Sequence, residues 1–175
     1  MPDSTTNLAP SSGDSVDRMI ADLSNPLKFR AYLLKSLPSC LWWGIGVKHL
    51  TRETCQITIP YSYRTKNPFN SIYFAAMCGA GEFATGALCK LALGEGRDVS
   101  MLVINQESEF TKKASSEVTF TCEQGREVAE VIARARATGA PQTCRMVAEG
   151  KMDNGVRVGS VTITWSFLLR KPRKK

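Results

Sequence analysis

The longest apolar stretch of the chain runs from Ser71 to Leu93 and predicts one buried helix. Its letters, SIYFAAMCGAGEFATGALCKLAL, are apolar on nearly every side, which is typical of a helix that is covered all round. Gly94-Glu95-Gly96 supplies the expected end of this helix, because glycine readily adopts the left-handed conformation of a C-terminal cap. The ten residues from Ile72 to Gly81 that precede the first charge are too few to cross a bilayer, so we expect no membrane span.

Two shorter helical patterns precede this segment. Apolar residues at helical spacing predict a first helix that begins after a cap at Asp14 or Ser15; they are Val16, Met19, Ile20 and Leu23. Asn25-Pro26 predicts the start of a second helix, because proline suits the first helical position, and Pro38 ends it near Leu37. Together the two segments predict a helical hairpin or a kinked helix at the N-terminus.

Alternation of apolar and polar residues predicts strands on both sides of the long helix. The alternating sets are Trp43, Ile45 and Val47, then Cys55, Ile57 and Ile59, then Val118, Phe120 and Cys122, and finally Cys144, Met146 and Ala148. The continuous apolar run from Val99 to Ile104 predicts a fully buried strand, and a short amphipathic helix is predicted around residues 128–135. The last strand follows an Asp153-Asn154-Gly155 turn, and its change of register predicts a bulge at Gly159-Ser160.

This order of elements predicts an α+β fold in which a curved antiparallel sheet wraps around one long central helix. The length of 175 residues fits a single domain. We expect a disordered leader over residues 1–13, one domain over 14–170 and a basic tail over 171–175. Within the domain, N-terminal helices occupy 14–37 and the core occupies 38–170. The first residues contain no basic flank followed by an apolar core, so no signal peptide is expected and the protein is predicted to be cytoplasmic.

The charge of the chain is concentrated at one end. The formal net charge is +7, and the segment from Arg170 to Lys175 supplies five of the positive charges. The rest of the chain is therefore only mildly basic, and no nucleic-acid partner is expected. A third possible role, an interaction protein that reaches nucleic acid or a membrane through this basic segment, remains open.

The cysteines and histidine do not predict a metal site. The six cysteines show no C-x-x-C pair, and His49 is the only histidine of the chain. A core of this size needs no disulfides, so free thiols in a reducing compartment are the favoured interpretation. We therefore expect no metal and no redox cofactor.

Glu82 is the outstanding candidate for chemistry, because it is the only charged residue between Ser71 and Cys89. An ionised carboxylate inside an apolar helix costs several kcal/mol unless it is paired, wet or neutralised. Desolvation raises the pKa of such a group toward the working pH, where it can act as a general base or nucleophile. Glu82 is accompanied on its predicted face by small residues, namely Ala75, Cys78, Gly79, Gly86 and Cys89, which leave space for a ligand or a second helix. The opposite face is predicted to carry Tyr73, Met77, Leu88 and Leu91.

The pattern from about Pro38 to Arg170 resembles the hotdog fold, and more specifically the PaaI-like acyl-CoA thioesterases together with a related uncharacterised hotdog group. In that family an Asn in the loop before the central helix is followed fifteen residues later by an acidic residue on the helix, as Asn67 is here by Glu82. Some members also carry a Ser or Thr at the start of the next strand, and Ser100 fits that position. Where the family commonly has His-Gly-Gly, this chain has Tyr73-Phe74-Ala75.

The resemblance implies a metal-free hydrolysis of an acyl thioester carried by CoA or by an acyl carrier protein. Glu82 activates water or attacks the carbonyl, Asn67 orients the water or the carbonyl, and Ser100 bonds to the water or to Glu82. The backbone N–H of Phe74 polarises the carbonyl at the helix N-terminus. Tyr73 and Gly79 are expected near the substrate. Members of the fold generally form homodimers or homotetramers with a shared site, so Asn67 and Glu82 are expected to come from different chains.

Other interpretations of the same residues remain open. Glu82 can pair with a basic residue across a dimer interface, and Asn67 before Pro68 is a common turn signal. Arg64 and Lys66 are candidates for the phosphates of a CoA carrier, and they are equally typical of a solvated loop. Loss of the His-Gly-Gly motif favours a second function, in which a hotdog protein binds acyl-CoA or fatty-acyl groups without turnover.

Overall fold

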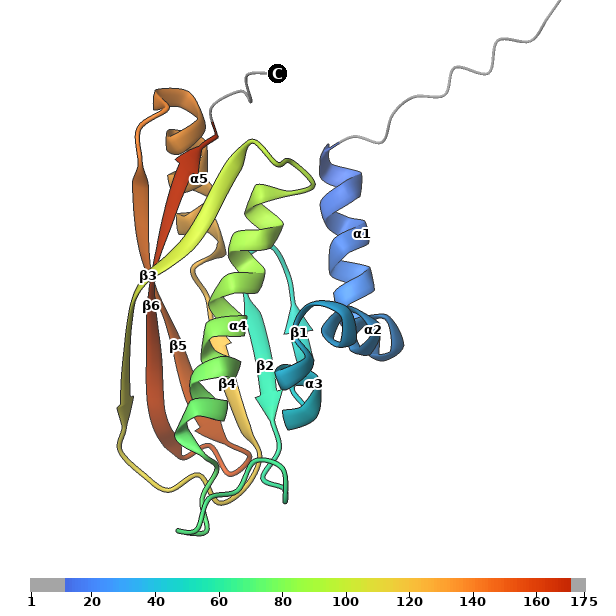
Figure 1. Cartoon of the computed structure of the whole chain (residues 1–175), viewed down its shortest axis with the longest axis vertical. Coiled ribbons are helices and arrows are strands. Elements are labelled where there is room, and N and C mark those ends of the chain that lie inside the picture. The colour runs from blue at the N-terminus through green and yellow to red at the C-terminus, as the bar shows by residue number, and fades with distance from the viewer. Residues whose placement is uncertain (1–11, 171–175) are drawn as a thin grey trace, which may run out of the picture.

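One antiparallel sheet forms the framework of the structure, a computed structural model that describes residues 12–170 (Figure 1). Six strands lie in the order β1-β2-β4-β5-β6-β3 within the described part of the chain. Their bounds are β1 Gly46–Leu50, β2 Cys55–Ile59, β3 Val99–Phe110, β4 Val118–Cys122, β5 Gln142–Met152 and β6 Arg157–Leu169. The helices are α1 Ser12–Ser24, α2 Pro26–Ser36, α3 Pro38–Trp43, α4 Phe74–Leu93 and α5 Gly125–Thr138. The predicted α+β class, with a sheet curved around a central helix, is confirmed.

The central helix α4 begins three residues later than predicted. Ile72 forms a β-bridge with Lys66, and Tyr73 has an extended backbone, so Ser71 to Tyr73 belong to the preceding loop. The helix ends at the predicted glycine, where Gly94 donates its N–H to the carbonyl groups of Lys90 and Leu91. Twelve of its residues are buried, and the helix packs against the sheet and α5. This burial explains its nearly uniform apolar sequence.

Three helices of the described residues precede the sheet, where two were predicted. Trp43 was expected in a strand, but it ends α3, and β1 begins at Gly46. The reason is local: Pro38 ends α2 and also suits the first position of a new helix, while Gly44 caps α3 with a φ of 75°. Helix α1 starts at Ser12, so two residues of the predicted leader are helical, and 1–11 and 171–175 lie outside the described residues.

Strand β3 is an edge strand, and the expectation of a fully buried strand from Val99 to Ile104 was wrong. Among residues 12–170 it pairs only with β6, and it continues to Phe110. Leu102 is 66% exposed and Ile104 is 54% exposed, although both are apolar. A continuous apolar run is compatible both with a strand that is buried within its own chain and with an edge strand that exposes apolar side chains.

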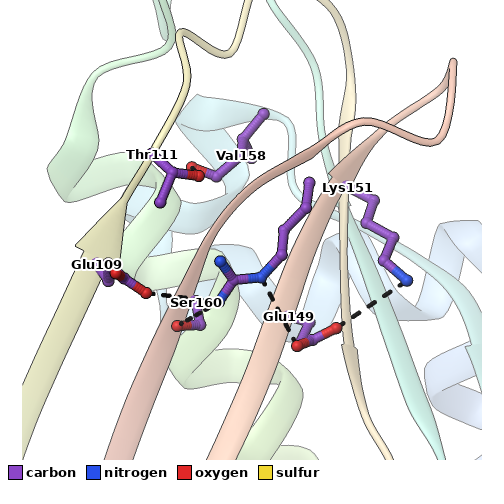
Figure 2. Close-up of polar contacts among 7 residues, drawn as sticks. Glu109, Thr111, Glu149, Lys151, Val158 and Ser160 are labelled. Carbon is purple, nitrogen blue, oxygen red and sulfur yellow. Dashed lines mark hydrogen bonds and ion pairs between the residues drawn. The ribbon is translucent and has the colours of Figure 1, made fainter.

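The predicted bulge of the last strand lies at Val158. Gly150 pairs with Gly159, whereas Lys151 pairs with Arg157, so β6 carries one extra residue at that point. The outer face of the sheet is charged here. Arg157 lies 3.6 Å from a Glu109 carboxylate oxygen and 3.7 Å from one of Glu149, and it thereby connects three strands (Figure 2). The core lies on the opposite face, beneath α4 and α5.

No helix among residues 12–170 is both long enough and apolar enough to span a membrane.

Candidate functional site

Glu82 lies in the middle of α4, beside a cavity of about 180 Å³. Besides α4 itself, four elements contribute lining residues to the cavity, namely Leu23 of α1, Tyr32 of α2, Met101 of β3 and Trp165 of β6. Most of these side chains are apolar or aromatic. The carboxylate therefore lies in an apolar environment that is open enough to admit a small group.

Burial raises the pKa of Glu82 above its ordinary value of 4.5. Within residues 12–170, none of the ion pairs involves this carboxylate. The pKa of Tyr32 is also raised, first by burial and then by the negative charge of Glu82. A carboxylate that forms no ion pair with any of residues 12–170, in an apolar cavity and with a raised pKa, is suited to accept a proton.

A chain of two hydrogen bonds runs from the sheet to the backbone carbonyl of Glu82. Trp165 donates its indole N–H to Thr85 Oγ1 at 3.0 Å, and the Thr85 hydroxyl donates to the carbonyl of Glu82 at 2.9 Å. Both Thr85 and Trp165 are buried. The Trp165 ring also lies close to Gly86, where an added Cβ would be 3.3 Å from the ring. These contacts set the rotation of α4, and with it the direction in which Glu82 projects.

Asn67 holds the loop before α4. Its Oδ1 accepts hydrogen bonds from the N–H groups of Phe69 at 2.9 Å and Ser71 at 3.3 Å, and its Nδ2 donates to the carbonyl of Ile72 at 3.5 Å. Both ends of the amide are therefore engaged within the loop. This is the arrangement of an Asx turn, the interpretation that the Asn67-Pro68 sequence had left open.

Ser100 does not contact Glu82 in the chain. Its register partner is Leu168, which is exposed, whereas the neighbouring Met101 pairs with buried Phe167. Because successive residues of a strand point to opposite faces, Ser100 lies on the face of the sheet turned away from α4. Its hydroxyl donates to the carbonyl of Leu168 at 3.1 Å. Met101 takes the place beside Glu82 that was predicted for Ser100.

Phe74, the residue predicted to polarise the carbonyl through its backbone N–H, lies at the N-terminus of α4. Phe74 is the first helical residue, and Tyr73 provides no side-chain cap. Within residues 12–170 no hydrogen bond occupies the N–H of Phe74, which leaves this donor available to a ligand. Eight residues separate Phe74 from Glu82, or about 12 Å along the helix axis. One chain therefore does not bring the Phe74 donor and the Glu82 carboxylate to the same carbonyl.

Arg64 and Lys66, in the loop before α4, each lie against an aromatic ring. Arg64 lies over the Trp42 ring at 5.8 Å, and Lys66 lies over the Tyr63 ring at 5.6 Å. These four residues and Asn67 line a cleft of about 460 Å³. Trp42 is exposed on α3.

The small residues around Glu82 have separate roles. Gly79 leaves room for Trp43, because a Cβ at this position would lie 2.8 Å from the Trp43 ring. Cys78 faces β3, with its sulfur 3.3 Å from the Ser108 hydroxyl. Cys89, in contrast, is buried, and burial raises the pKa of its thiol, so it belongs to the core face. Tyr73, expected on the core face, is exposed.

The cavity residues Leu23, Tyr32, Leu37 and Trp165 were not predicted as site residues. Leu23 had been identified only as an apolar position of a helix. Tyr32 carried no signal, because the resemblance began only near Pro38. Within residues 12–170 no group of three or more His, Cys, Asp or Glu side chains is arranged to hold a metal ion.

Residues 28–167 match the model of a family described as "Domain of unknown function (DUF4442)". No curated protein is a significant match to the sequence.

Several solved structures share the fold. A protein from Pseudomonas aeruginosa, described as a "Probable Thioesterase", matches with a TM-score of 0.68 and 14% identity, over 85% of this chain and 99% of its own. A protein of unknown function from Chlorobaculum tepidum matches with a TM-score of 0.70 and 14% identity, over 86% and 99% of the two chains. A thioesterase from Haemophilus influenzae matches with a TM-score of 0.63 and 14% identity, over 86% and 95%. The predicted hotdog fold is confirmed.

Proposed function

Because this chain belongs to the DUF4442 family and has the hotdog fold, we propose that it hydrolyses acyl thioesters at a site built around Glu82. The observation that carries the proposal is the half-buried Glu82 carboxylate, which has a raised pKa and opens on an apolar cavity. Two of the structures with this fold are described as thioesterases, which supports the choice of reaction. A carboxylate and a water suffice for this chemistry, so no metal or redox cofactor takes part in the proposed reaction.

In the proposed reaction, Glu82 takes a proton from a water while the water oxygen forms a bond to the thioester carbonyl carbon. The C–S bond then breaks, the carboxylic acid forms, and the departing sulfur receives the proton held by Glu82. In the alternative that the sequence left open, the Glu82 carboxylate attacks the carbonyl carbon, the C–S bond breaks and the thiolate leaves and takes a proton from water, so that a mixed anhydride with Glu82 remains. Water then hydrolyses this anhydride to the carboxylic acid and restores the Glu82 carboxylate. A single turnover followed by mass analysis of the intact protein distinguishes the two, because only the second adds the acyl mass.

The carbonyl oxygen is proposed to bind the free N–H of Phe74 from a second chain. The N-terminus of α4 carries a partial positive charge, which stabilises the negative oxygen that develops during attack. The separation of about 12 Å between Phe74 and Glu82 along one helix requires two chains for one site. Asn67 lies in the loop before α4, and its proposed role is to hold the start of the helix in position.

The exposed edge of β3 supports a dimer of this kind. Leu102 and Ile104 are exposed apolar residues on a strand whose other side is paired to β6. Gln106 and Ser108 of the same strand contact Cys78 on α4, so the edge adjoins the face of the helix that carries Glu82. A second copy paired along this edge would cover the apolar side chains and approach the Glu82 face.

The aromatic and basic cleft supports a thioester carried by CoA. Arg64 and Lys66 supply positive charge for phosphates, and both belong to the loop that leads into α4. An exchange of both residues for Gln is expected to raise KM for acyl-CoA and to leave kcat unchanged. The protein is proposed to act in the cytoplasm, where acyl-CoA and acyl carrier protein substrates occur.

The second candidate function is acyl binding without turnover. Both ends of the Asn67 amide are occupied and Ser100 faces away from α4, so two of the residues expected to assist Glu82 are used elsewhere. This observation favours a protein that keeps the acyl cavity and has lost the reaction.

The test is thiol release from a panel of acyl-CoAs by the wild-type protein and by Glu82→Gln. We expect release that is lost, by about 100-fold or more, in the amide variant, since a positioned base contributes about 10² to 10⁴ in rate. The amide has nearly the same shape as the carboxylate, so the oligomer and the fold are expected to remain. Full activity of Glu82→Gln contradicts the catalytic proposal. A rise in melting temperature with acyl-CoA, without release, identifies the binding function.

A further inference from the structure

Two cavities meet at the same side chains near Glu82. The cavity beside Glu82 has a volume of about 180 Å³, and a groove between α1 and α2 has a volume of about 470 Å³. Leu23, Tyr32 and Lys90 line both of them. These side chains therefore form the boundary between the cavity at the carboxylate and the groove beyond it.

Tyr32 is the largest side chain of this boundary. It is contributed by α2 and is 42% exposed, so one part of the ring is covered and the other faces the groove. The pKa of its phenol is raised by burial, then by Glu82 and then by Cys40, consistent with a ring that lies near the Glu82 carboxylate. Beyond Tyr32, the lining of the groove includes the apolar side chains of Met19 and Ala31.

We propose that Tyr32 is a specificity-determining residue that closes the acyl cavity at Glu82 and thereby sets the longest acyl chain that the protein accepts. The occupant of the cavity is the acyl chain of the thioester whose carbonyl lies at Glu82, so the inference rests on the proposed function. The groove between α1 and α2 is the space that a longer chain enters once the Tyr32 ring is removed.

The volumes give the expected limit. A water occupies about 30 Å³ in the liquid, and a methylene is of similar size, so the cavity of about 180 Å³ holds roughly six such groups. The groove could hold a much longer chain. Its lining includes the apolar side chains of Met19, Leu23 and Ala31 together with charged ones, among them Lys28, whose Nζ lies 2.6 Å from an Asp22 carboxylate oxygen. An alkyl chain would contact the apolar side chains, while Lys28 and Asp22 remain paired with each other.

The experiment measures kcat/KM for straight-chain acyl-CoAs of increasing length. For the wild type we expect values that rise to about six carbons and then fall. For Tyr32→Ala the rise is expected to continue, by up to roughly fourfold for each methylene that finds apolar contact. Tyr32→Trp enlarges the side chain and is expected to move the limit to shorter chains. Tyr32→Phe keeps the ring, and Leu34→Ala removes an exposed side chain from the same helix, so both are expected to keep the wild-type limit.

Binding provides the second readout, which does not depend on turnover. Dissociation constants for the same acyl-CoAs are measured by calorimetry in Glu82→Gln and in Glu82→Gln combined with Tyr32→Ala. A chain-length limit that lengthens only when Tyr32 is truncated supports the proposal, even if no variant releases thiol and the hydrolase function fails. An equal limit with and without the Tyr32 ring overturns it, and so does the absence of binding at every length.

Discussion

Trp165 on β6 donates its indole N–H to the hydroxyl of Thr85 on α4, at 3.0 Å, one turn of helix from Glu82. The two residues are eighty positions apart, and both are buried. Thr85 in turn donates to the carbonyl of Glu82. The sheet thereby controls the rotation of the helix that presents the carboxylate.

Thr85→Val is expected to destabilise the protein by about 1–3 kcal/mol, because it keeps the shape but leaves the buried Trp165 N–H without an acceptor. Denaturant unfolding measures this change in the free energy of unfolding. Thr85→Ser retains the hydroxyl and is the matched control, expected within about 1 kcal/mol of the wild type. Equal stability of the valine variant and the wild type would show that the hydrogen bond carries no net stabilisation.

Turnover is expected to depend on pH through Glu82. The proposed base must be ionised, and burial raises its pKa above 4.5, so kcat/KM should increase as the pH rises through the raised value. A pH profile of thiol release measures this. Activity that is independent of pH from 4 to 8 would contradict the role of Glu82 as the base.

The same pKa has a consequence for stability. Since the folded-state pKa of Glu82 is raised, the folded protein binds this proton more tightly than the unfolded chain does. The contribution of Glu82 to stability is therefore fully present below the pKa of Glu82 in the unfolded chain. It is lost as the pH rises through the pKa of Glu82 in the folded protein. The melting temperature of Glu82→Gln should match that of the wild type at low pH and exceed it increasingly at higher pH. A constant difference across this range would contradict the linkage.

Asn67→Ala is expected to lower stability by about 1–2 kcal/mol, because the N–H groups of Phe69 and Ser71 lose their side-chain acceptor. Asn67→Asp keeps the acceptor and loses the Nδ2 donor, so its stability should be closer to that of the wild type. Thermal unfolding and thiol release of both variants are compared. If Asn67→Ala lowers turnover at unchanged stability, Asn67 acts on the substrate and not on the loop.

Leu102→Asp, alone or with Ile104→Asp, is expected to weaken the proposed dimer, since either change places a charge on the apolar edge of β3. The molar mass in solution, measured by light scattering, should decrease toward that of one chain, and turnover should fall with it. Leu27→Asp changes an exposed apolar residue on α2 and serves as the control. An unchanged molar mass in the β3 variants would exclude this edge as the interface.

Several elements were predictable because their signals are local. The positions Val128, Val131, Ile132 and Ala135 all lie on the buried face of α5, as their helical spacing had predicted. The alternating residues of β2 and β4 are buried as expected. The helical position of Trp43 was not predicted, because α3 has only six residues. So short a segment does not establish a helical periodicity next to the strand-like alternation that follows.

The class of the fold, the identity of the central helix and the choice of Glu82 as the candidate base all followed from the pattern of residues along the chain. A single charge in an apolar helix stands out without any knowledge of its neighbours, because its burial is costly. The side chains that enclose that carboxylate, the engagement of Asn67 in its own loop and the outward direction of Ser100 became evident only from the folded chain. Those facts depend on strand register and on contacts such as Trp165 with Thr85, which join residues far apart in the chain and leave no periodic trace in the sequence.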